Sequence, residues 1–374
     1  MSPSSERPAL VFINGRFLTQ PMTGVQRYAT ELTKAIDKLF EQGHDATSGL
    51  ELVLLTPLGR RSSIALKRIV VREVGPLSGH AWEQWTLPRN TAGRLLVGFG
   101  NTGPVLKRRQ VVTIHDASVF AVPESYTPAF RCWYRVLLPA LGLVSDAVVT
   151  VSSFSLGELS RRMGIPSSKI RIVPNGVDHI VATLPDRGIL IRHGLRPRGF
   201  ILAVGSKATH KNVDILVQAI EQVGRPDYDV VVAGGANPRI LAERRSELPG
   251  RVIHLGYVSD SELRALYESA ACFAFTSVYE GFGLPPLEAM ACGCPVVVSR
   301  TAALPEVCGD GALYADPRDP GDIARCINEI LGSPTLQRDL EDRGLKRAAR
   351  FTWERSACEV LALIRELVCL PKLV

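Results

Sequence analysis

Residues 272–298 read Cys-Phe-Ala-Phe-Thr-Ser-Val-Tyr-Glu-Gly-Phe-Gly-Leu-Pro-Pro-Leu-Glu-Ala-Met-Ala-Cys-Gly-Cys-Pro-Val-Val-Val. The apolar run 272–276 predicts a buried parallel strand. Gly281 and Gly283 predict a loop whose backbone can approach a ligand closely. The two prolines that follow suit the first turn of a helix, and 295–298 predicts the next strand. A strand, a glycine-rich loop and a helix N-terminus together offer free N–H groups to an anion.

Two carboxylates flank this glycine-rich loop. Glu280 directly precedes Gly281, and Glu288 lies eight positions after Glu280. A carboxylate beside a phosphate is unfavourable unless it binds hydroxyl groups, so the pair indicates a ligand with both groups, such as a nucleotide-sugar. The alternative is a surface helix with an ordinary acidic residue near its start.

The stretch resembles the signature of a known enzyme family. Glu280 and Glu288, with seven residues between them, are similar to the Glu-seven-Glu motif of the retaining glycosyltransferases of family four, and the strings 279–285 and 288–293 are typical of it. The resemblance implies the α/β fold called GT-B. In that fold, two doubly wound Rossmann-like domains face each other across a cleft, and a C-terminal helix packs back on the first domain.

The rest of the chain is consistent with two such domains. A length of 374 residues favours two domains with separate cores, and strand and helix patterns alternate in both halves. Residues 174–178 have strong turn chemistry. The resemblance implies an acceptor-binding domain over 1–180 and a nucleotide-sugar-binding domain over 181–374, the latter with the terminal crossover helix.

Two features of the first half belong to the predicted site. The apolar strand 111–114 ends in His115 and Asp116, and ligands bind at such carboxyl edges, although a lone histidine there is more often structural. The string 113–116 resembles a motif of bacterial polysaccharide glycosyltransferases in this family. That implies that His115 reaches the transferred sugar, while Asp116 orients His115 or contacts the acceptor. Gly24 opens a predicted helix, and the resemblance implies that it faces the donor diphosphate.

The second half opens with a similar loop. The strand 200–204 is followed by a glycine and by Lys211 at a helix start, which suits a diphosphate. The family usually carries an arginine directly after this glycine, but Ser206 stands there. Whether Lys207 supplies that charge is left open by the sequence.

The resemblance assigns each residue a role. Glu288 binds the ribose hydroxyls, Glu280 binds hydroxyls of the donor sugar, and Tyr257 and Val258 border the nucleobase. The predicted catalytic residues are His115, Glu280 and Lys211. The predicted donor contacts are Gly24, Ser206, Lys207, Lys211, Tyr257, Val258, Glu280, Gly281, Phe282, Gly283, Leu284 and Glu288. No Asp-x-Asp element ends a strand, and we expect neither a metal nor a cofactor.

The predicted reaction is glycosyl transfer, with retention, from a nucleoside-diphosphate sugar to a saccharide or lipid-linked saccharide in surface polysaccharide synthesis. GDP-mannose is the expected donor, with UDP- and dTDP-sugars open. A hydrolase is disfavoured because its two carboxyls flank the glycosidic bond, whereas here both flank one loop. An epimerase or phosphorylase on this fold and a non-catalytic sugar-nucleotide-binding protein are the alternatives.

The charge is unevenly distributed. Residues 1–180 hold 21 Lys/Arg and 13 Asp/Glu, a balance of +8 within a total of +7. This half either contacts an anionic membrane or is a solvated face. No nucleic-acid motif is present, so we expect no nucleic-acid partner. No apolar run approaches the ~20 residues that span a bilayer, and residues 1–7 lack a signal-peptide core. We expect a cytoplasmic protein, peripheral on the inner face of the membrane if it touches one.

Overall fold

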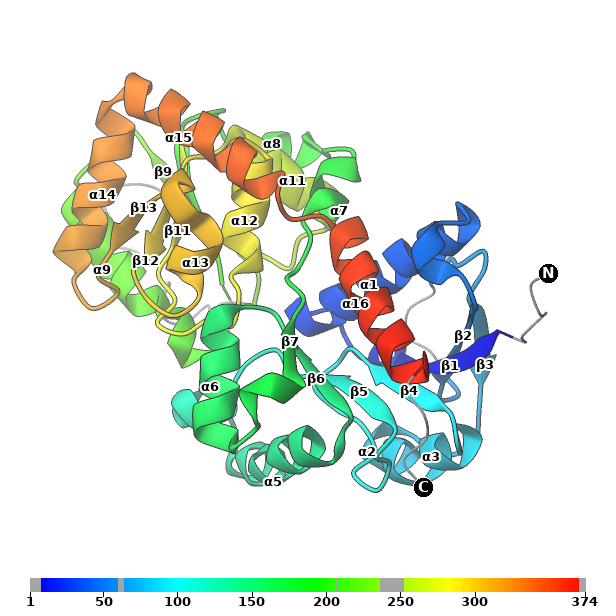
Figure 1. Cartoon of the computed structure of the whole chain (residues 1–374). Helices are drawn as coiled ribbons and strands as arrows, with labels where there is room; N and C mark the ends of the chain where they lie inside the picture. Colours follow the sequence, from blue (N-terminus) through cyan, green and yellow to red (C-terminus); the bar gives the residue numbers. More distant parts are fainter. Residues whose placement is uncertain (1–7, 60–63, 206–207, 236–251, 370–374) are drawn as a thin grey trace. The chain divides into compact units, whose positions relative to one another are not determined.

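The fold has two units, each with a parallel sheet and helices (Figure 1). The computed structural model describes residues 8–59, 64–205, 208–235 and 252–369. Unit 1 comprises the described parts of Met1–Ala117, Pro128–Gly176 and Thr352–Val374. Unit 2 comprises those of Ser118–Thr127 and Val177–Phe351.

Unit 1 is built on seven described parallel strands in the order β3-β2-β1-β4-β5-β6-β7. The strands are β1 (Ala9–Asn14), β2 (Leu50–Thr56), β3 (Val70–Glu73), β4 (Leu95–Gly98), β5 (Gln110–Thr113), β6 (Ala147–Thr150) and β7 (Ile170–Ile172). The central strands are buried along their length. That burial explains why their sequences are continuous apolar runs rather than alternating ones.

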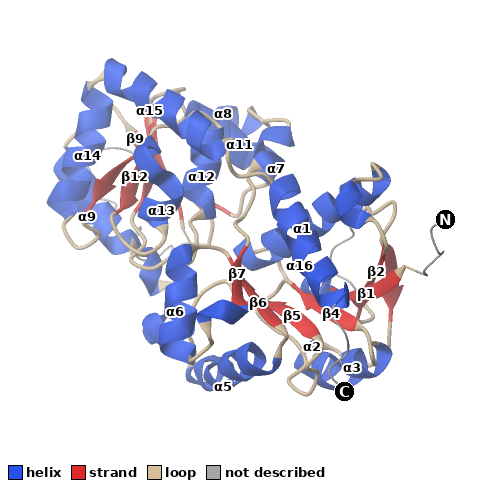
Figure 2. Ribbon diagram, viewed as in Figure 1, coloured by secondary structure: helices blue, strands red, loops and turns tan. Residues whose placement is uncertain are grey.

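Helices cover both faces of this sheet (Figure 2). They are α1 (Gly24–Glu41), α2 (Gly79–Ala81), α3 (Leu87–Asn90), α5 (Pro128–Val144), α6 (Ser153–Met163) and α16 (Trp353–Cys369). Trp82 and Leu87 pack against Phe12 and Leu96 of the sheet in one buried cluster. Helix α6 begins as its sequence predicts, because the Ser152 side chain accepts a hydrogen bond from the Ser155 N–H.

The C-terminal helix belongs to unit 1, which confirms the predicted crossover. Helix α16 packs against α1, and the Trp353 ring lies 5.8 Å from the Tyr28 ring, edge to face. The Ser356 hydroxyl donates to the Pro174 carbonyl at 2.7 Å. A Cβ on Gly176 would lie 2.2 Å from the Trp353 backbone nitrogen, so only glycine permits this approach.

Unit 2 has six described parallel strands in the order β10-β9-β8-β11-β12-β13. They are β8 (Phe200–Val204), β9 (Asp229–Ala233), β10 (Val252–Gly256), β11 (Cys272–Phe275), β12 (Val296–Ser299) and β13 (Ala312–Ala315). This order is that of the doubly wound fold, so the fold class predicted from the sequence is confirmed for both units.

The described helices of unit 2 flank that sheet (Figure 2). They are α4 (Ser118–Ala121), α7 (Asp178–Ala182), α8 (Gly188–His193), α9 (Val213–Val223), α11 (Asp260–Ser269), α12 (Leu284–Ala291), α13 (Leu304–Cys308), α14 (Pro320–Gly332) and α15 (Pro334–Ala348). Helix α11 opens with a capping box in which Ser259 and Glu262 satisfy each other's backbone N–H groups. Helices α9 and α14 pack together over the main core.

The sequence analysis divides the chain once, near residue 180, but the contacts in the structure assign two segments to the other unit. The chain passes from unit 1 to unit 2 between Gly176 and Val177. Residues 118–127, which the sequence places in the first domain, have their contacts in unit 2. Residues 352–374 return to unit 1. Among the described residues, no helix combines the length and the apolar character needed to cross a membrane.

Candidate active site

The strand order of unit 2 reverses between β8 and β11, which are neighbours in the sheet. From this point successive crossovers run outward in opposite directions, so the loops after the two strands open a crevice at the carboxyl edge. The loop after β8 carries Lys211, and the loop after β11 carries Glu280. The two loops that the sequence predicts to bind the donor are therefore the two that follow the strands at this reversal point.

Lys211 and Glu280 form an ion pair at this edge. The Lys211 Nζ lies 2.6 Å from the Glu280 Oε1, and the two side chains are 21% and 13% exposed. The same ammonium lies 5.4 Å from the centre of the Phe275 ring, within the range of a cation–π contact. Asn212, which takes a left-handed backbone conformation, ties the loop down by donating to the Thr276 carbonyl at 3.1 Å.

Glu288, on α12, forms a buried polar triad with His179 and Tyr267. Its Oε1 lies 2.9 Å from the His179 Nε2, and its Oε2 accepts a hydrogen bond from the Tyr267 hydroxyl at 3.3 Å. Burial and the Glu288 charge raise the pKa of Tyr267 well above its ordinary value, so the phenol stays protonated and donates. The carboxylate is thereby held in one orientation.

The sequence analysis missed both partners of Glu288. His179 follows directly on the predicted turn at 174–178, but its partner is 109 residues later in the chain. Tyr267 is fully buried on α11, at a helical spacing that predicts only a core residue. Neither position carries a local signal for a polar contact.

The glycine-rich loop has the geometry that its sequence predicts. Gly283 has a φ of 102°, and a Cβ there would lie 2.6 Å from the Leu304 Cδ2. Helix α12 then begins at Leu284 with prolines in its first turn, as predicted. Because Pro285 and Pro286 lack N–H groups, the groups left for an anion at this end are those of Gly283 and Leu284.

The other residues predicted for the donor are distributed around this edge. Ser206 and Lys207 lie outside the described residues. Tyr257 follows β10 and is 79% exposed, which leaves its ring free to stack on a base. The Phe282 side chain instead packs edge to face on Phe351 at 5.7 Å, so the backbone is the part of Phe282 available to a ligand. Gly281 is also buried.

The residues predicted in the first half, Gly24, His115 and Asp116, belong to unit 1. His115 is buried, and its Nε2 lies 3.1 Å from the Phe99 carbonyl, so the proton is on Nε2 and Nδ1 is the acceptor. Burial lowers the pKa of His115, which keeps the ring neutral. Gly24 is the first residue of α1, with open space where a Cβ would lie.

Unit 1 has a polar cluster of its own where its strand order reverses, between β1 and β4. The Arg16 Nη1 lies 3.0 Å from the Glu83 Oε2, and Asn14 and Thr102 donate to Glu83 Oε1 at 2.8 and 2.6 Å. Burial opposes ionisation of Glu83, but hydrogen bonds, that of His80 foremost, and the Arg16 charge lower its pKa overall. The sequence analysis did not identify this cluster.

Residues 118–127 reach the Lys211 loop through Ser125. Its hydroxyl lies 2.8 Å from the Thr209 hydroxyl and 2.9 Å from the His210 Nδ1. The His210 carbonyl in turn accepts from the Val278 N–H at 2.9 Å. The segment after the His115-Asp116 motif therefore supports the loops after β8 and β11, a role that no local pattern indicates.

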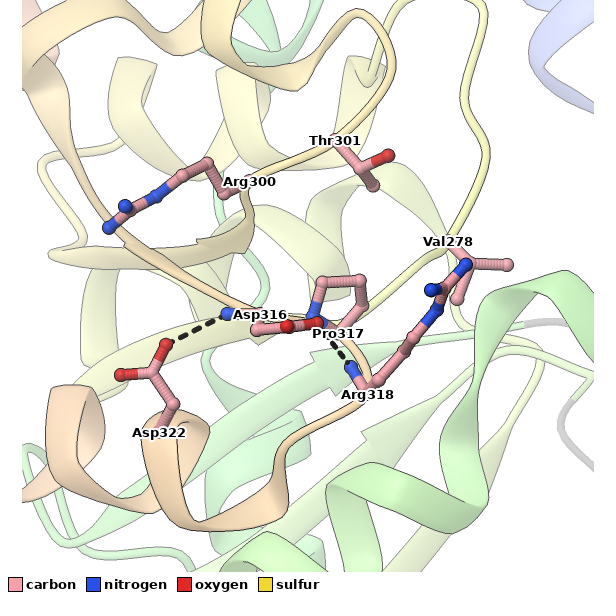
Figure 3. A pocket seen from close by; sticks show the side chains of 7 residues that line it. All are labelled: Val278, Arg300, Thr301, Asp316, Pro317, Arg318 and Asp322. Atoms are coloured by element: carbon pink, nitrogen blue, oxygen red, sulfur yellow. Dashed lines mark hydrogen bonds between the residues drawn. The ribbon is translucent and has the colours of Figure 1, made fainter.

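A cavity of about 410 Å³ opens at the same edge, beside the Glu280 loop (Figure 3). Its lining comes from the segments that follow β11, β12 and β13, and from the start of α14: Val278, Arg300, Thr301, Asp316, Pro317, Arg318 and Asp322. None of these residues is among those predicted for the donor. The Arg318 side chain points toward Val278, and Arg300 points away from it (Figure 3).

Comparisons with known proteins match both halves of the chain. The family model described as Glycosyltransferase Family 4 matches residues 22–180, and the model described as Glycosyl transferases group 1 matches residues 193–347. The O-antigen chain mannosyltransferase B of Escherichia coli is 31% identical over 369 residues, covering 91% of this chain and 95% of that protein. The chain belongs to glycosyltransferase family 4.

Solved structures support the fold of this glycosyltransferase. Sucrose-phosphate synthase from Thermosynechococcus elongatus superposes with a TM-score of 0.75 at 21% identity, over 97% of this chain and 99% of that one. HepE of Anabaena, in a complex with UDP and glucose, superposes with a TM-score of 0.71 at 16% identity, over 97% and 100%. These likenesses establish the GT-B fold. The two family matches include the positions of His115 in the first half and of Lys211, Glu280 and Glu288 in the second.

Proposed function

We propose that this glycosyltransferase moves a mannosyl group from a nucleoside-diphosphate sugar, GDP-mannose, to a saccharide or lipid-linked saccharide acceptor, with retention and without a metal. The observation that carries the proposal is the Lys211–Glu280 pair at the point where the strand order of unit 2 reverses. The mannosyl group and surface polysaccharide synthesis are supported by the similarity to the O-antigen enzyme. The nucleotide is supported by the UDP in the complex of HepE.

The leaving group of this reaction is a nucleoside diphosphate, whose growing negative charge needs cations and N–H dipoles. The Lys211 ammonium is paired with the Glu280 carboxylate. When a diphosphate binds, we expect Lys211 to turn to it, together with the N–H groups of Gly283 and Leu284. That exchange releases the Glu280 carboxylate to accept hydrogen bonds from hydroxyls of the donor sugar.

The remaining predicted contacts fit the same ligand. Glu288, held by His179 and Tyr267, keeps free lone pairs for the two ribose hydroxyls. Tyr257 is exposed after β10 and offers a ring face to the nucleobase. In unit 1, the neutral His115 offers Nδ1 as an acceptor for a sugar hydroxyl.

A ligand panel tests this assignment. Thermal shift and donor turnover are measured with GDP-mannose, UDP-glucose, UDP-N-acetylglucosamine and dTDP-rhamnose, with EDTA present throughout. GDP-mannose is expected to raise the melting temperature and to be turned over, and Lys211→Ala to lose both responses. Lys346→Ala, an exposed lysine on α15 paired with Asp342, is the matched control. Activity that requires a divalent metal would contradict the metal-free reaction, and a response to a different donor alone would replace GDP-mannose.

Retention is tested on the product. A same-face mechanism, in which the leaving phosphate helps to deprotonate the acceptor hydroxyl, is what the family implies for a site without an obvious nucleophile. Nuclear magnetic resonance of the product formed from an α-linked donor is expected to show the α anomer. A β anomer would refute retention and would require a base on the opposite face of the sugar.

We also propose that unit 1 contacts an anionic membrane through the first half of α5. Phe130, Trp133 and Val136 are 38%, 42% and 66% exposed there, and Arg131 and Arg135 lie among them. Exposed aromatic side chains interleaved with arginines suit the interface of an anionic bilayer.

Vesicle sedimentation tests this contact. Binding is expected to vesicles that contain phosphatidylglycerol but not to pure phosphatidylcholine, and to weaken in Trp133→Ala. Ile191→Ala, an 83% exposed apolar residue of unit 2, serves as the matched control. If Trp133→Ala and Ile191→Ala sediment equally with the phosphatidylglycerol vesicles, α5 is not the membrane contact.

A further inference from the structure

Asn101 lies beside His115 at the carboxyl edge of the sheet in unit 1. It follows the end of β4, His115 follows the end of β5, and these two strands are neighbours in the sheet (Figure 1). Asn101 has a φ of 60°, and among the described residues of unit 1 no other residue except glycine has a positive φ. Asparagine is one of the few residues that tolerate this left-handed conformation. The chain therefore turns out of the sheet at Asn101.

Two polar groups of Asn101 continue the pairing of β4 with β5 past this turn. Its N–H donates to the Thr113 carbonyl at 3.1 Å, and its side-chain Oδ1 accepts from the His115 N–H at 2.8 Å. In a parallel pair, a residue bonds the neighbouring strand through its own N–H and its own carbonyl. At Asn101 the side-chain oxygen accepts in place of that carbonyl, so the His115 N–H stays bonded although the neighbouring backbone has turned.

Other groups of unit 1 hold the rest of His115. The Nε2 lies 3.1 Å from the Phe99 carbonyl, and the Thr150 hydroxyl donates to the His115 carbonyl at 3.4 Å. The ring of the buried Tyr28 lies edge to face with the imidazole, with 4.8 Å between the ring centres. Together with Asn101, these contacts fix the plane of the imidazole and the direction of the Nδ1 lone pair.

We propose that Asn101 is a positioning residue for the transfer reaction, and that it acts by holding His115 at the end of the sheet. The inference rests on the proposed function, in which the His115 Nδ1 accepts from a hydroxyl of the transferred sugar. The bond from the His115 N–H to Asn101, at 2.8 Å, is the shortest of the three hydrogen bonds described for His115. Its loss therefore frees the residue most, and a misplacement of about 1 Å can reduce a rate about 100-fold.

Two substitutions separate the Asn101 oxygen from its backbone conformation. Asn101→Gly keeps the left-handed turn without steric cost but removes Oδ1, whereas Asn101→Asp keeps an acceptor oxygen and tolerates the turn. With the donor that the ligand panel identifies, Asn101→Gly is expected to lower kcat about tenfold or more and to change the donor KM less than about threefold, because the donor is bound mainly by unit 2. Asn101→Asp, assayed at about pH 8 to keep the imidazole neutral, is expected to restore most of kcat. Asn90→Gly, at an exposed asparagine that ends α3 in unit 1, is the matched control.

A double-mutant cycle tests whether Asn101 acts through His115. In the His115→Ala enzyme, adding Asn101→Gly is expected to lower kcat by less than about twofold, because the side chain that Asn101 positions is already absent. If the two effects on kcat instead multiply, Asn101 acts independently of His115 and the proposal is overturned. A wild-type kcat in either single variant would overturn it too.

Amide hydrogen exchange provides a measurement that does not depend on turnover. Asn101→Gly is expected to speed exchange of the His115 amide about tenfold or more, while the amides of β6 keep their wild-type rates. Unchanged exchange at His115, or an equal increase across β6, would overturn the proposal, because the effect would then be absent or general to the sheet. If the wild-type protein turns over no nucleotide-sugar, the proposed function falls, and the exchange rate of the His115 amide alone decides whether Asn101 holds it.

Discussion

Replacing His179 with alanine tests how the donor is held by Glu288. The change removes the 2.9 Å contact to Glu288 Oε1 and leaves the buried carboxylate with the 3.3 Å bond from Tyr267. A hydrogen bond to a charged group contributes about 1.5–3 kcal/mol. Each 1.4 kcal/mol is a factor of ten in affinity, so we expect the donor KM to rise roughly 10- to 100-fold.

The split between kinetic constants distinguishes positioning from a loss of the fold. Because Glu288 is assigned to the ribose, far from the reacting bond, kcat is expected to change by less than about threefold. His179→Gln, whose amide can donate at similar reach, is expected to restore part of the affinity, and Tyr267→Phe to cost less than His179→Ala. Steady-state kinetics and thermal unfolding are measured together, with His193→Ala on α8 as the control. An unchanged KM in folded His179→Ala, or a collapse of kcat alone, would refute the reasoning.

Three predictions concern other parts of the molecule. Gly176→Ala is expected to lower the melting temperature strongly, because its Cβ would lie 2.2 Å from the Trp353 backbone nitrogen; a normal melting curve would contradict this contact. Glu83→Gln is expected to cost about 3–5 kcal/mol near neutral pH, measured by urea unfolding. Since the folded-state pKa of Glu83 is lowered, its contribution is present above the unfolded pKa and lost as pH falls through the folded one. The difference in free energy of unfolding between Glu83→Gln and the wild type should therefore become smaller in acid, and a difference that does not change with pH would argue against the ion pair. Gly283→Ala is expected to weaken nucleotide binding in the ligand panel, because alanine is strained at a φ of 102° and meets Leu304.

The fold could be predicted largely because its signals are local. The apolar run 272–276, the glycines and the prolines that follow gave β11, the loop and α12 in their observed order. The capping box at Ser259 is likewise a four-residue pattern. Each of these structures depends on contacts between residues that are close together in the chain, so a short stretch of sequence is enough to predict it.

The candidate site was predictable only where a motif marks it. Lys211 and Glu280 were identified separately, but their 2.6 Å pairing joins residues 69 positions apart. The contact of His179 with Glu288 and that of Ser125 with His210 span 109 and 85 positions. Such polar contacts depend on the order of the strands in the sheet, and the pattern of apolar residues along the chain does not predict that order. For the same reason residues 118–127 join unit 2 without any sign in their composition.

The two reversal points in strand order show why the anionic ligand is assigned to unit 2. Both bring a cation and a carboxylate together, but Glu83 is fully buried and its partner Arg16 is 11% exposed. Drawing Arg16 to a ligand would leave a buried, uncompensated carboxylate, which costs about 3–5 kcal/mol. Lys211 and Glu280 are more exposed, and a donor carrying both phosphates and hydroxyls offers each of them a new partner. The exchange therefore leaves neither charge unpaired, and a diphosphate sugar fits this point better than the one in unit 1.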